Sequence, residues 1–175
     1  MYAPIDLGTP EEALLRRKET LAAIVGDAEY VCETRRLARF VERTGTPVFE
    51  YSFEYQVDPV AGSRAIHGLE VNLLFGNNFG APSNYVLGEA DRDFSRSMAG
   101  YWARFAATGT PNVDDDSVAH WPAFKHPTGR GRGADKHLVL AVPNREGMRL
   151  REAACDFWEP YYLRTITGTV PASQP

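Results

Sequence analysis

The chain has 175 residues, of which 43% are hydrophobic and 11% aromatic, so it has enough apolar side chains to bury a core. Its formal net charge is -4, and acidic and basic residues are interspersed, which excludes the basic footprint typical of a protein that binds nucleic acid or an anionic membrane. No apolar run approaches the roughly 20 residues that a membrane span needs. Residues 1–10 lack the basic and apolar regions of a signal peptide, which fits a cytosolic protein or one whose true N-terminus lies upstream.

Two helices are predicted in the first 45 residues. Thr9 is typical of a helix cap, Pro10 follows it, and the two glutamates after Pro10 favour a helix N-terminus. Gly26 closes this helix, whose apolar face consists of Leu14, Leu15, Leu21, Ile24 and Val25. Asp27 is interpreted as the cap of a second helix that stops at Gly45 and has apolar positions at Val31, Leu37, Phe40 and Val41.

Residues 47–55 form the strongest predicted strand. The segment is dense in apolar and aromatic residues, and period-two spacing places four of them on one face, namely Phe49, Tyr51, Phe53 and Tyr55. A loop is expected from Asp58 to Ser63. His67 and Gly68 lie at its far end, just before the apolar residues 71–75.

The second half of the chain contains the clearest amphipathic helix, over residues 89–107. Its apolar positions recur at helical spacing, and Gly109 ends it. Residues 111–134 are predicted to be mostly loop, anchored by Trp121 and Pro122, and the biased stretch 129–133 is interpreted as a solvated loop and not as a phosphate or RNA contact. A short strand is expected over 137–142. A terminal helix is expected over 151–166, with Pro160 kinking or dividing it.

This order of helices and strands predicts an α/β arrangement. Two strands do not make a stable sheet, so further strands are expected to precede residue 1. Residues 1–167 are assigned to the domain, and residues 168–175 to a flexible tail. The two cysteines, Cys32 and Cys155, fit either one disulfide or two buried thiols.

The segment from Ser63 to Gly76 resembles a hallmark of the type-B carboxylesterase and cholinesterase family, in which a loop after a core strand ends in His-Gly-x-Glu and continues to Phe-Gly. Four further segments match the family in the same order: 48–53 is similar to the strand before the histidine loop, 101–112 to Tyr-Trp-x-x-Phe-Ala-x-x-Gly-x-Pro-Asn, 121–124 to Trp-Pro-x-Tyr/Phe and 155–158 to Cys-x-Phe-Trp. The resemblance covers roughly residues 25 to 163.

The resemblance implies the C-terminal portion of an α/β-hydrolase fold, with His67 as the general base of a Ser-Glu/Asp-His triad. Two roles for Glu70 remain open: it tunes the site through hydrogen bonds, or it is a buried carboxylate paired for structural reasons. The family also implies a disulfide between Cys32 and Cys155. No cofactor is expected, and no metal, since no further ligand is spaced to join His67 and Glu70; nothing favours His120, His126 or His137 as ligands.

The nucleophile motif Gly-x-Ser-x-Gly is absent from the sequence, and so is a glycine-rich oxyanion segment. The chain order in this fold is Ser, then Asp or Glu, then His, so the nucleophile and the acid are expected upstream of residue 1. Ser63 lacks the sharp turn that exposes a nucleophile, and Asp58 is interpreted as a turn-forming Asp-Pro and not as a partner of His67.

The expected function is therefore that of a fragment of a carboxylic ester hydrolase, acting on a small-molecule ester in the complete enzyme and inactive by itself. The alternative is an inactive truncated product or an interaction module. Apolar faces left uncovered would favour self-association. A secreted or extracytoplasmic location is expected if the full-length protein has a signal peptide and the disulfide forms.

Overall fold

The computed structural model describes residues 9–57, 65, 67–80, 84–126 and 135–167. The chain forms two compact units, each described by itself: a first unit made of the chain up to Thr46 and from Arg149 onward, and a second unit, Pro47–Met148. Three sequence expectations lie outside the described residues, namely the loop from Asp58 to Ser63, the glycine-arginine stretch 129–133 and the tail 168–175.

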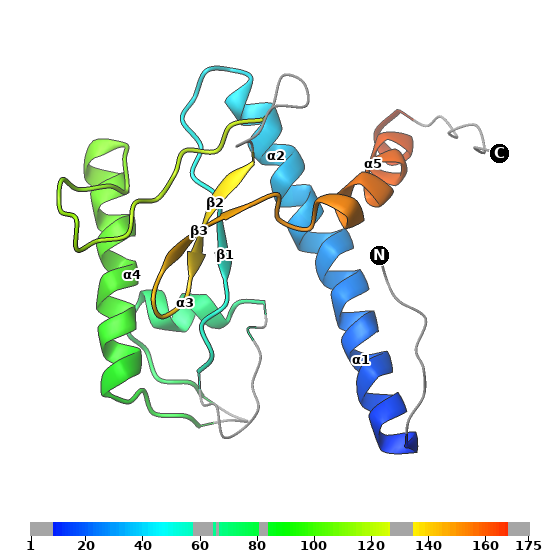
Figure 1. Ribbon diagram of the computed structural model, residues 1–175, viewed down its shortest axis with the longest axis horizontal. Helices are drawn as coiled ribbons and strands as arrows, with labels where there is room; N and C mark the ends of the chain where they lie inside the picture. Colours follow the sequence, from blue (N-terminus) through cyan, green and yellow to red (C-terminus); the bar gives the residue numbers. More distant parts are fainter. Residues whose placement is uncertain (1–8, 58–64, 66, 81–83, 127–134, 168–175) are drawn as a thin grey trace. The chain divides into compact units, whose positions relative to one another are not determined.

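The first unit begins with one long helical run, drawn from blue to cyan in Figure 1. It consists of α1 (Pro10–Gly26), a π-helical turn η1 (Asp27–Val31) and α2 (Cys32–Glu42). Thr9 caps α1 as predicted: its backbone N–H donates to Glu12 Oε2 at 2.8 Å, and the Glu12 N–H donates to Thr9 Oγ1 at 3.3 Å. The apolar side chains of α1 are largely exposed, including Leu14, Leu15 and Leu21, and only Ala13 is buried.

The interpretation of Asp27 as a helix cap is wrong. The helical backbone continues through this residue, and the Asp27 side chain is buried. Its carboxylate accepts two hydrogen bonds from the guanidinium of Arg151, 124 residues away, one of them from Nε at 2.8 Å. This partner satisfies the carboxylate, so Asp27 does not need the exposed amides of a helix N-terminus.

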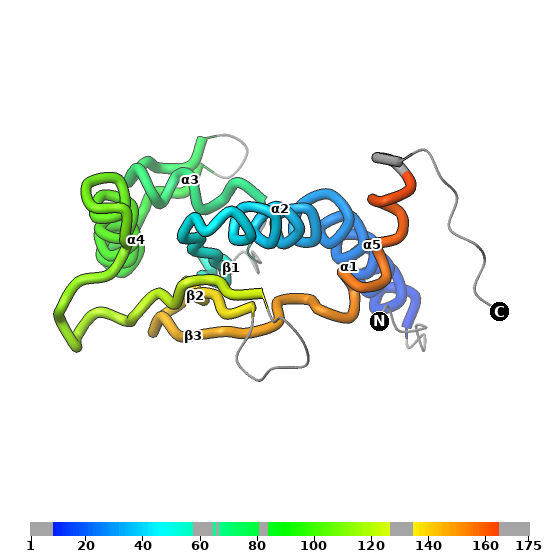
Figure 2. The backbone as a smooth tube through the Cα atoms, turned by 90° about the horizontal axis from the view of Figure 1, so that it is seen from above, coloured from blue at the N-terminus to red at the C-terminus, as the bar shows by residue number. Residues whose placement is uncertain are grey.

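The C-terminal helix α5 (Glu152–Thr167) completes the first unit and lies beside η1 and α2 (Figure 2). Pro160 does not divide the helix, because α5 runs through it as one helix. The residues beyond the proline are held by Tyr162, whose hydroxyl donates to the Ala28 carbonyl at 2.5 Å and whose ring lies 4.9 Å from the Arg36 guanidinium carbon. These contacts attach the part of α5 that follows the proline, which itself removes one helical hydrogen bond.

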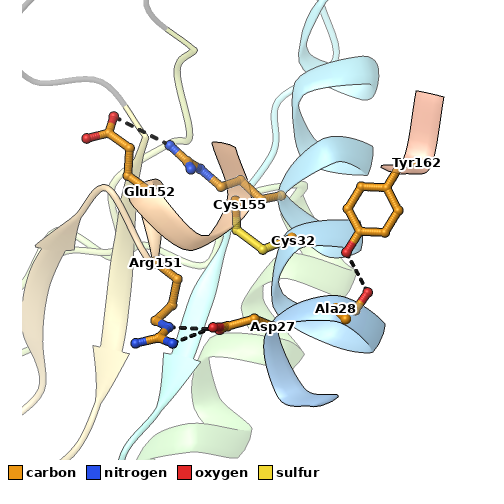
Figure 3. Close-up of a disulfide and its surroundings, with 8 residues drawn as sticks. Asp27, Ala28, Cys32, Arg151, Glu152, Cys155 and Tyr162 are labelled. Carbon is orange, nitrogen blue, oxygen red and sulfur yellow. Dashed lines mark hydrogen bonds and ion pairs between the residues drawn. A yellow bond between two sulfur atoms is a disulfide. The ribbon is translucent and has the colours of Figure 1, made fainter. Parts of the chain in front are cut away.

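The disulfide implied by the family is present between Cys32 and Cys155, which are both buried. It joins α2 to α5 beside the Asp27–Arg151 pair (Figure 3). A disulfide and an ion pair therefore connect the N-terminal helices to the C-terminal segment within the first unit.

The second unit contains a mixed three-stranded sheet in the order β1-β2-β3. The strands are β1 (Tyr51–Phe53), β2 (Lys136–Leu140), which is parallel to β1, and β3 (Arg145–Met148), which is antiparallel to β2. The strand predicted over 47–55 is thus shorter, and β3 was not predicted. Helices and this small sheet together agree with the predicted α/β class.

Helix α4 (Glu89–Thr108) covers one face of the sheet and matches its prediction, including Gly109 as the residue that ends it. Four aromatic residues point to this face as expected, since Tyr51 contacts Trp102, Phe53 and Tyr55 contact Phe94, and Phe49 contacts Phe105. The buried core around them consists of Val57, Leu73, Leu87, Phe94, Met98, Tyr101, Trp121, Leu138 and Leu140.

Candidate functional site

His67 lies in a turn of the second unit that leads into the short helix α3 (Leu69–Leu74), and its side chain is exposed. The following residue, Gly68, caps α3 with a φ of 84°, in the left-handed region that favours glycine. The position of Gly68 directly after His67 thus has a structural reason, because this glycine makes the turn that starts α3.

Helix α3 is fixed against α4. Leu73 is fully buried in the core, and its carbonyl accepts a hydrogen bond from the Ser95 hydroxyl at 2.5 Å. The same carbonyl also accepts from the Gly76 amide at 3.0 Å, so the Ser95 hydroxyl is an additional attachment at the end of α3. The turn that carries His67 is therefore followed directly by a helix that is packed against α4.

Glu70 occupies the first turn of α3 and is half-buried. Burial raises the pKa of Tyr51 in β1, and the negative charge of Glu70 raises it further. The Glu70 carboxylate is thus close enough to β1 to act on a core tyrosine. Both interpretations of Glu70 remain predictions.

A second carboxylate near this segment, Asp91, was missed by the sequence reasoning. It is buried in the first turn of α4 and accepts hydrogen bonds from the Tyr55 hydroxyl at 2.7 Å, the Tyr85 hydroxyl at 2.8 Å and the Gly88 amide at 2.8 Å. Burial raises the pKa of Asp91, but the hydrogen bonds from Tyr55, Tyr85 and Gly88 outweigh it and hold this pKa below the usual value. An acidic residue in the first turn of a predicted helix is the sequence signal that marks this position, because the helix N-terminus favours negative charge.

The other histidines of the second unit lie elsewhere. His137 is buried inside β2, and His126 Nδ1 lies 3.3 Å from Oδ1 of the buried Asp135. His120 is exposed in the loop before Trp121. Among the residues that the structure describes, no group of three or more His, Cys, Asp or Glu side chains is arranged to hold a metal ion.

Within the same described ranges, no helix combines the length and apolarity required to cross a membrane. Ser63, the serine nearest to His67 in sequence, lies outside them.

The profile of the carboxylesterase family matches residues 7–158 of this chain. The match includes β1, the turn with His67, α3, α4 and the disulfide, which are the elements that carry the motif resemblance. The family acts on ester bonds and suggests a small-molecule substrate. The chain belongs to the carboxylesterase family.

Proposed function

We propose that this chain is the C-terminal part of a serine carboxylic ester hydrolase and that His67 is its general base. The observation that carries the proposal is the exposed His67 just before α3, in a segment that resembles the family motif. The match of residues 7–158 to the carboxylesterase family supports it. A general base must reach a serine hydroxyl and an orienting carboxylate, and an exposed turn beside a packed helix offers access together with a fixed support.

In this mechanism the neutral imidazole accepts the serine proton while the serine oxygen attacks the ester carbonyl carbon. The imidazolium then gives that proton to the leaving alcohol oxygen, and an acyl-enzyme forms. In deacylation the imidazole accepts a proton from water, whose oxygen attacks the acyl carbon, and returns the proton to the serine. His67 thus acts as base and acid in both halves of the reaction.

The serine, the triad acid and the oxyanion donors belong, in this proposal, to a segment upstream of residue 1. The chain order of the fold supports this placement, and so does the absence of Gly-x-Ser-x-Gly from the sequence. The sheet offers further support, since β1 is an aromatic-rich strand with a parallel partner on one side only within the described part of the chain. Parallel strands of this composition are usually interior members of larger sheets. Residues 1–167 would then be part of one α/β-hydrolase domain, with 168–175 as its tail.

A chimera tests the proposal: this chain replaces the C-terminal segment of an active carboxylesterase of the same family. The folded chimera is expected to hydrolyse p-nitrophenyl acetate, and His67→Gln to reduce kcat by roughly 10⁶-fold, the scale of losing a triad histidine. The control His120→Gln changes an exposed histidine elsewhere in the second unit and is expected to keep the activity. A folded chimera without turnover, or one in which His67→Gln is fully active, contradicts the proposal.

The isolated 175-residue chain tests the missing nucleophile. A serine-directed organophosphate is expected to leave its intact mass unchanged, and the chain is expected to turn over no p-nitrophenyl acetate. Stoichiometric labelling would show that a reactive serine lies within this chain.

The alternative role, an inactive interaction module, draws support from the exposed apolar side chains of α1, where Leu14, Leu15 and Leu21 are each more than half exposed. Light scattering coupled to size-exclusion chromatography discriminates here. Self-association that Leu15→Ser abolishes favours the module, whereas a monomer at all concentrations counts against it.

A further inference from the structure

Asp91 connects the two ends of the chain segment that contains His67. Tyr55 follows β1 at the start of this segment, and Tyr85 lies just before α4 at its end. The Tyr55 hydroxyl donates to Oδ1 of Asp91 at 2.7 Å, and the Tyr85 hydroxyl donates to Oδ2 at 2.8 Å. Each carboxylate oxygen therefore holds one flank of this segment.

The carboxylate that holds both flanks is itself fixed. Asp91 is only 5% exposed, and the Gly88 amide donates to its Oδ2 at 2.8 Å. Its position in the first turn of a 20-residue helix favours a negative charge, because the helix dipole is positive there. The ring of Tyr55 is stacked on Phe94, with centroids 4.0 Å apart and an interplanar angle of 7°. The hydroxyl of Tyr55 is thus held in place by its ring as well as by its hydrogen bond.

A second attachment lies between the two flanks, on the same face of α4. Ser95 follows Asp91 by four residues, the spacing that places two side chains above one another on a helix. Its hydroxyl donates to the Leu73 carbonyl of α3, the helix that begins two residues after His67. One face of α4 thus holds the segment at its start, at its end and at α3.

We propose that Asp91 is a positioning residue for His67: by holding Tyr55 and Tyr85 it fixes the direction in which the imidazole is presented. This inference rests on the proposed function, in which His67 is the general base. A base misplaced by about 1 Å loses up to about 10²-fold in rate, so contacts that hold the flanks of the segment with His67 bear on catalysis. Asp91 touches neither substrate nor His67 in this role.

The test uses the 175-residue chain with isotope-labelled histidine and observes the ring signals of its four histidines by NMR. Asp91→Ala removes the carboxylate that receives both hydroxyls. It is expected to shift and broaden the His67 signals and to leave those of His120 in place. The matched control is Asp93→Ala, which removes an exposed carboxylate from the same turn of α4 and is expected to move no histidine signal.

Tyr55→Phe and Tyr85→Phe each remove one hydroxyl, keep the ring, and carry the test if Asp91→Ala does not fold. Each is expected to shift the His67 signals in the same direction as the other and by less than Asp91→Ala. A purely stabilising role predicts that these variants lower the free energy of unfolding and change the His67 signals no more than those of His120. His67 signals identical to wild type in Asp91→Ala or in both tyrosine variants overturn the positioning role.

The chimera described above adds a kinetic readout. There Asp91→Ala is expected to reduce kcat by between about 10-fold and 10²-fold and to leave KM for p-nitrophenyl acetate within about twofold. If His67→Gln leaves turnover unchanged, the proposed function fails although the NMR result stands. If His67→Gln abolishes turnover while Asp91→Ala changes neither kcat nor the His67 signals, only the positioning role fails.

Discussion

The imidazole of His137 lies against the backbone of Gly147, its register partner across β2 and β3. A Cβ atom at position 147 would be 2.3 Å from Nε2 of His137 and 2.9 Å from Cγ2 of Val139. Atoms in a folded protein do not approach so closely, and both neighbours are buried. The glycine is therefore required by the histidine that it faces, and not by its backbone conformation.

Gly147→Ala is accordingly expected to lower the free energy of unfolding by about 1–3 kcal/mol, the usual cost of inserting a methyl group into a packed site. Gly80→Ala is the matched control in the same unit, because a Cβ there meets nothing within 4 Å. Urea unfolding followed by circular dichroism measures both. Equal stability of the two variants would mean that His137 moves aside at little cost.

The disulfide between Cys32 and Cys155 joins residues 123 positions apart. The chain-entropy description assigns the closure of so long a loop roughly 4–5 kcal/mol. The double variant Cys32→Ser, Cys155→Ser is expected to lower the free energy of unfolding by up to this amount, as measured by urea unfolding. Alkylation followed by intact mass checks the bond directly: no label is expected before reduction and two after it, and two labels on unreduced protein would contradict the disulfide.

Local periodicity accounts for the parts of the fold that the sequence predicts well. The aromatic residues from Phe49 to Tyr55 alternate at period two and face α4, and the apolar residues of α4 recur at helical spacing. Each of these patterns is visible within a single element. β3 has no such pattern, because Arg145, Glu146 and Met148 are exposed and the segment becomes a strand only by pairing with β2.

Long-range partners explain the remaining errors. Asp27 after Gly26 has the local pattern of a helix stop and a new cap, but a partner 124 residues away keeps the helical run continuous. The candidate site shows the same contrast between local sequence patterns and long-range contacts. The family motif identifies His67, whereas Asp91 is connected to Tyr55 across 36 residues and no local pattern indicates that contact.

The pair Asp27–Arg151 offers a direct test within the first unit. Arg151→Ala leaves the buried Asp27 carboxylate without two charge-assisted hydrogen bonds, which is expected to cost about 1.5–3 kcal/mol. Arg149→Ala is the matched control: both arginines have positive φ, 55° at Arg149 and 52° at Arg151, so the backbone effect is shared. Arg149 forms an exposed ion pair with Glu152 at 3.7 Å, which contributes less than about 1 kcal/mol. Equal losses in thermal or urea unfolding would assign the effect to backbone conformation.

The lowered pKa of Asp91 predicts how the free energy of unfolding changes at acid pH. Its pKa in the folded chain is raised by burial but lowered more by hydrogen bonds from Tyr55, Tyr85 and Gly88, so it lies below the usual value. A carboxyl whose folded pKa is depressed stabilises the fold above its unfolded pKa of about 3.9, and this contribution is lost as the pH falls through the lower folded value. Wild type is thus expected to exceed Asp91→Asn in unfolding free energy by a constant amount from pH 7 to about 5, and the difference is expected to shrink below about pH 4.

The comparison is made by urea unfolding at several pH values between 3 and 7, with Asp115→Asn as the control. The pKa of Asp115 is also lowered, by hydrogen bonds from the Ser117 side chain and amide, but Asp115 is fully exposed, and an asparagine keeps a side-chain oxygen that accepts from the Ser117 amide. Asp115→Asn is therefore expected to follow the wild-type curve closely. A wild-type advantage over Asp91→Asn that stays constant down to pH 3 would show that the ionised carboxylate is not what holds Tyr55 and Tyr85.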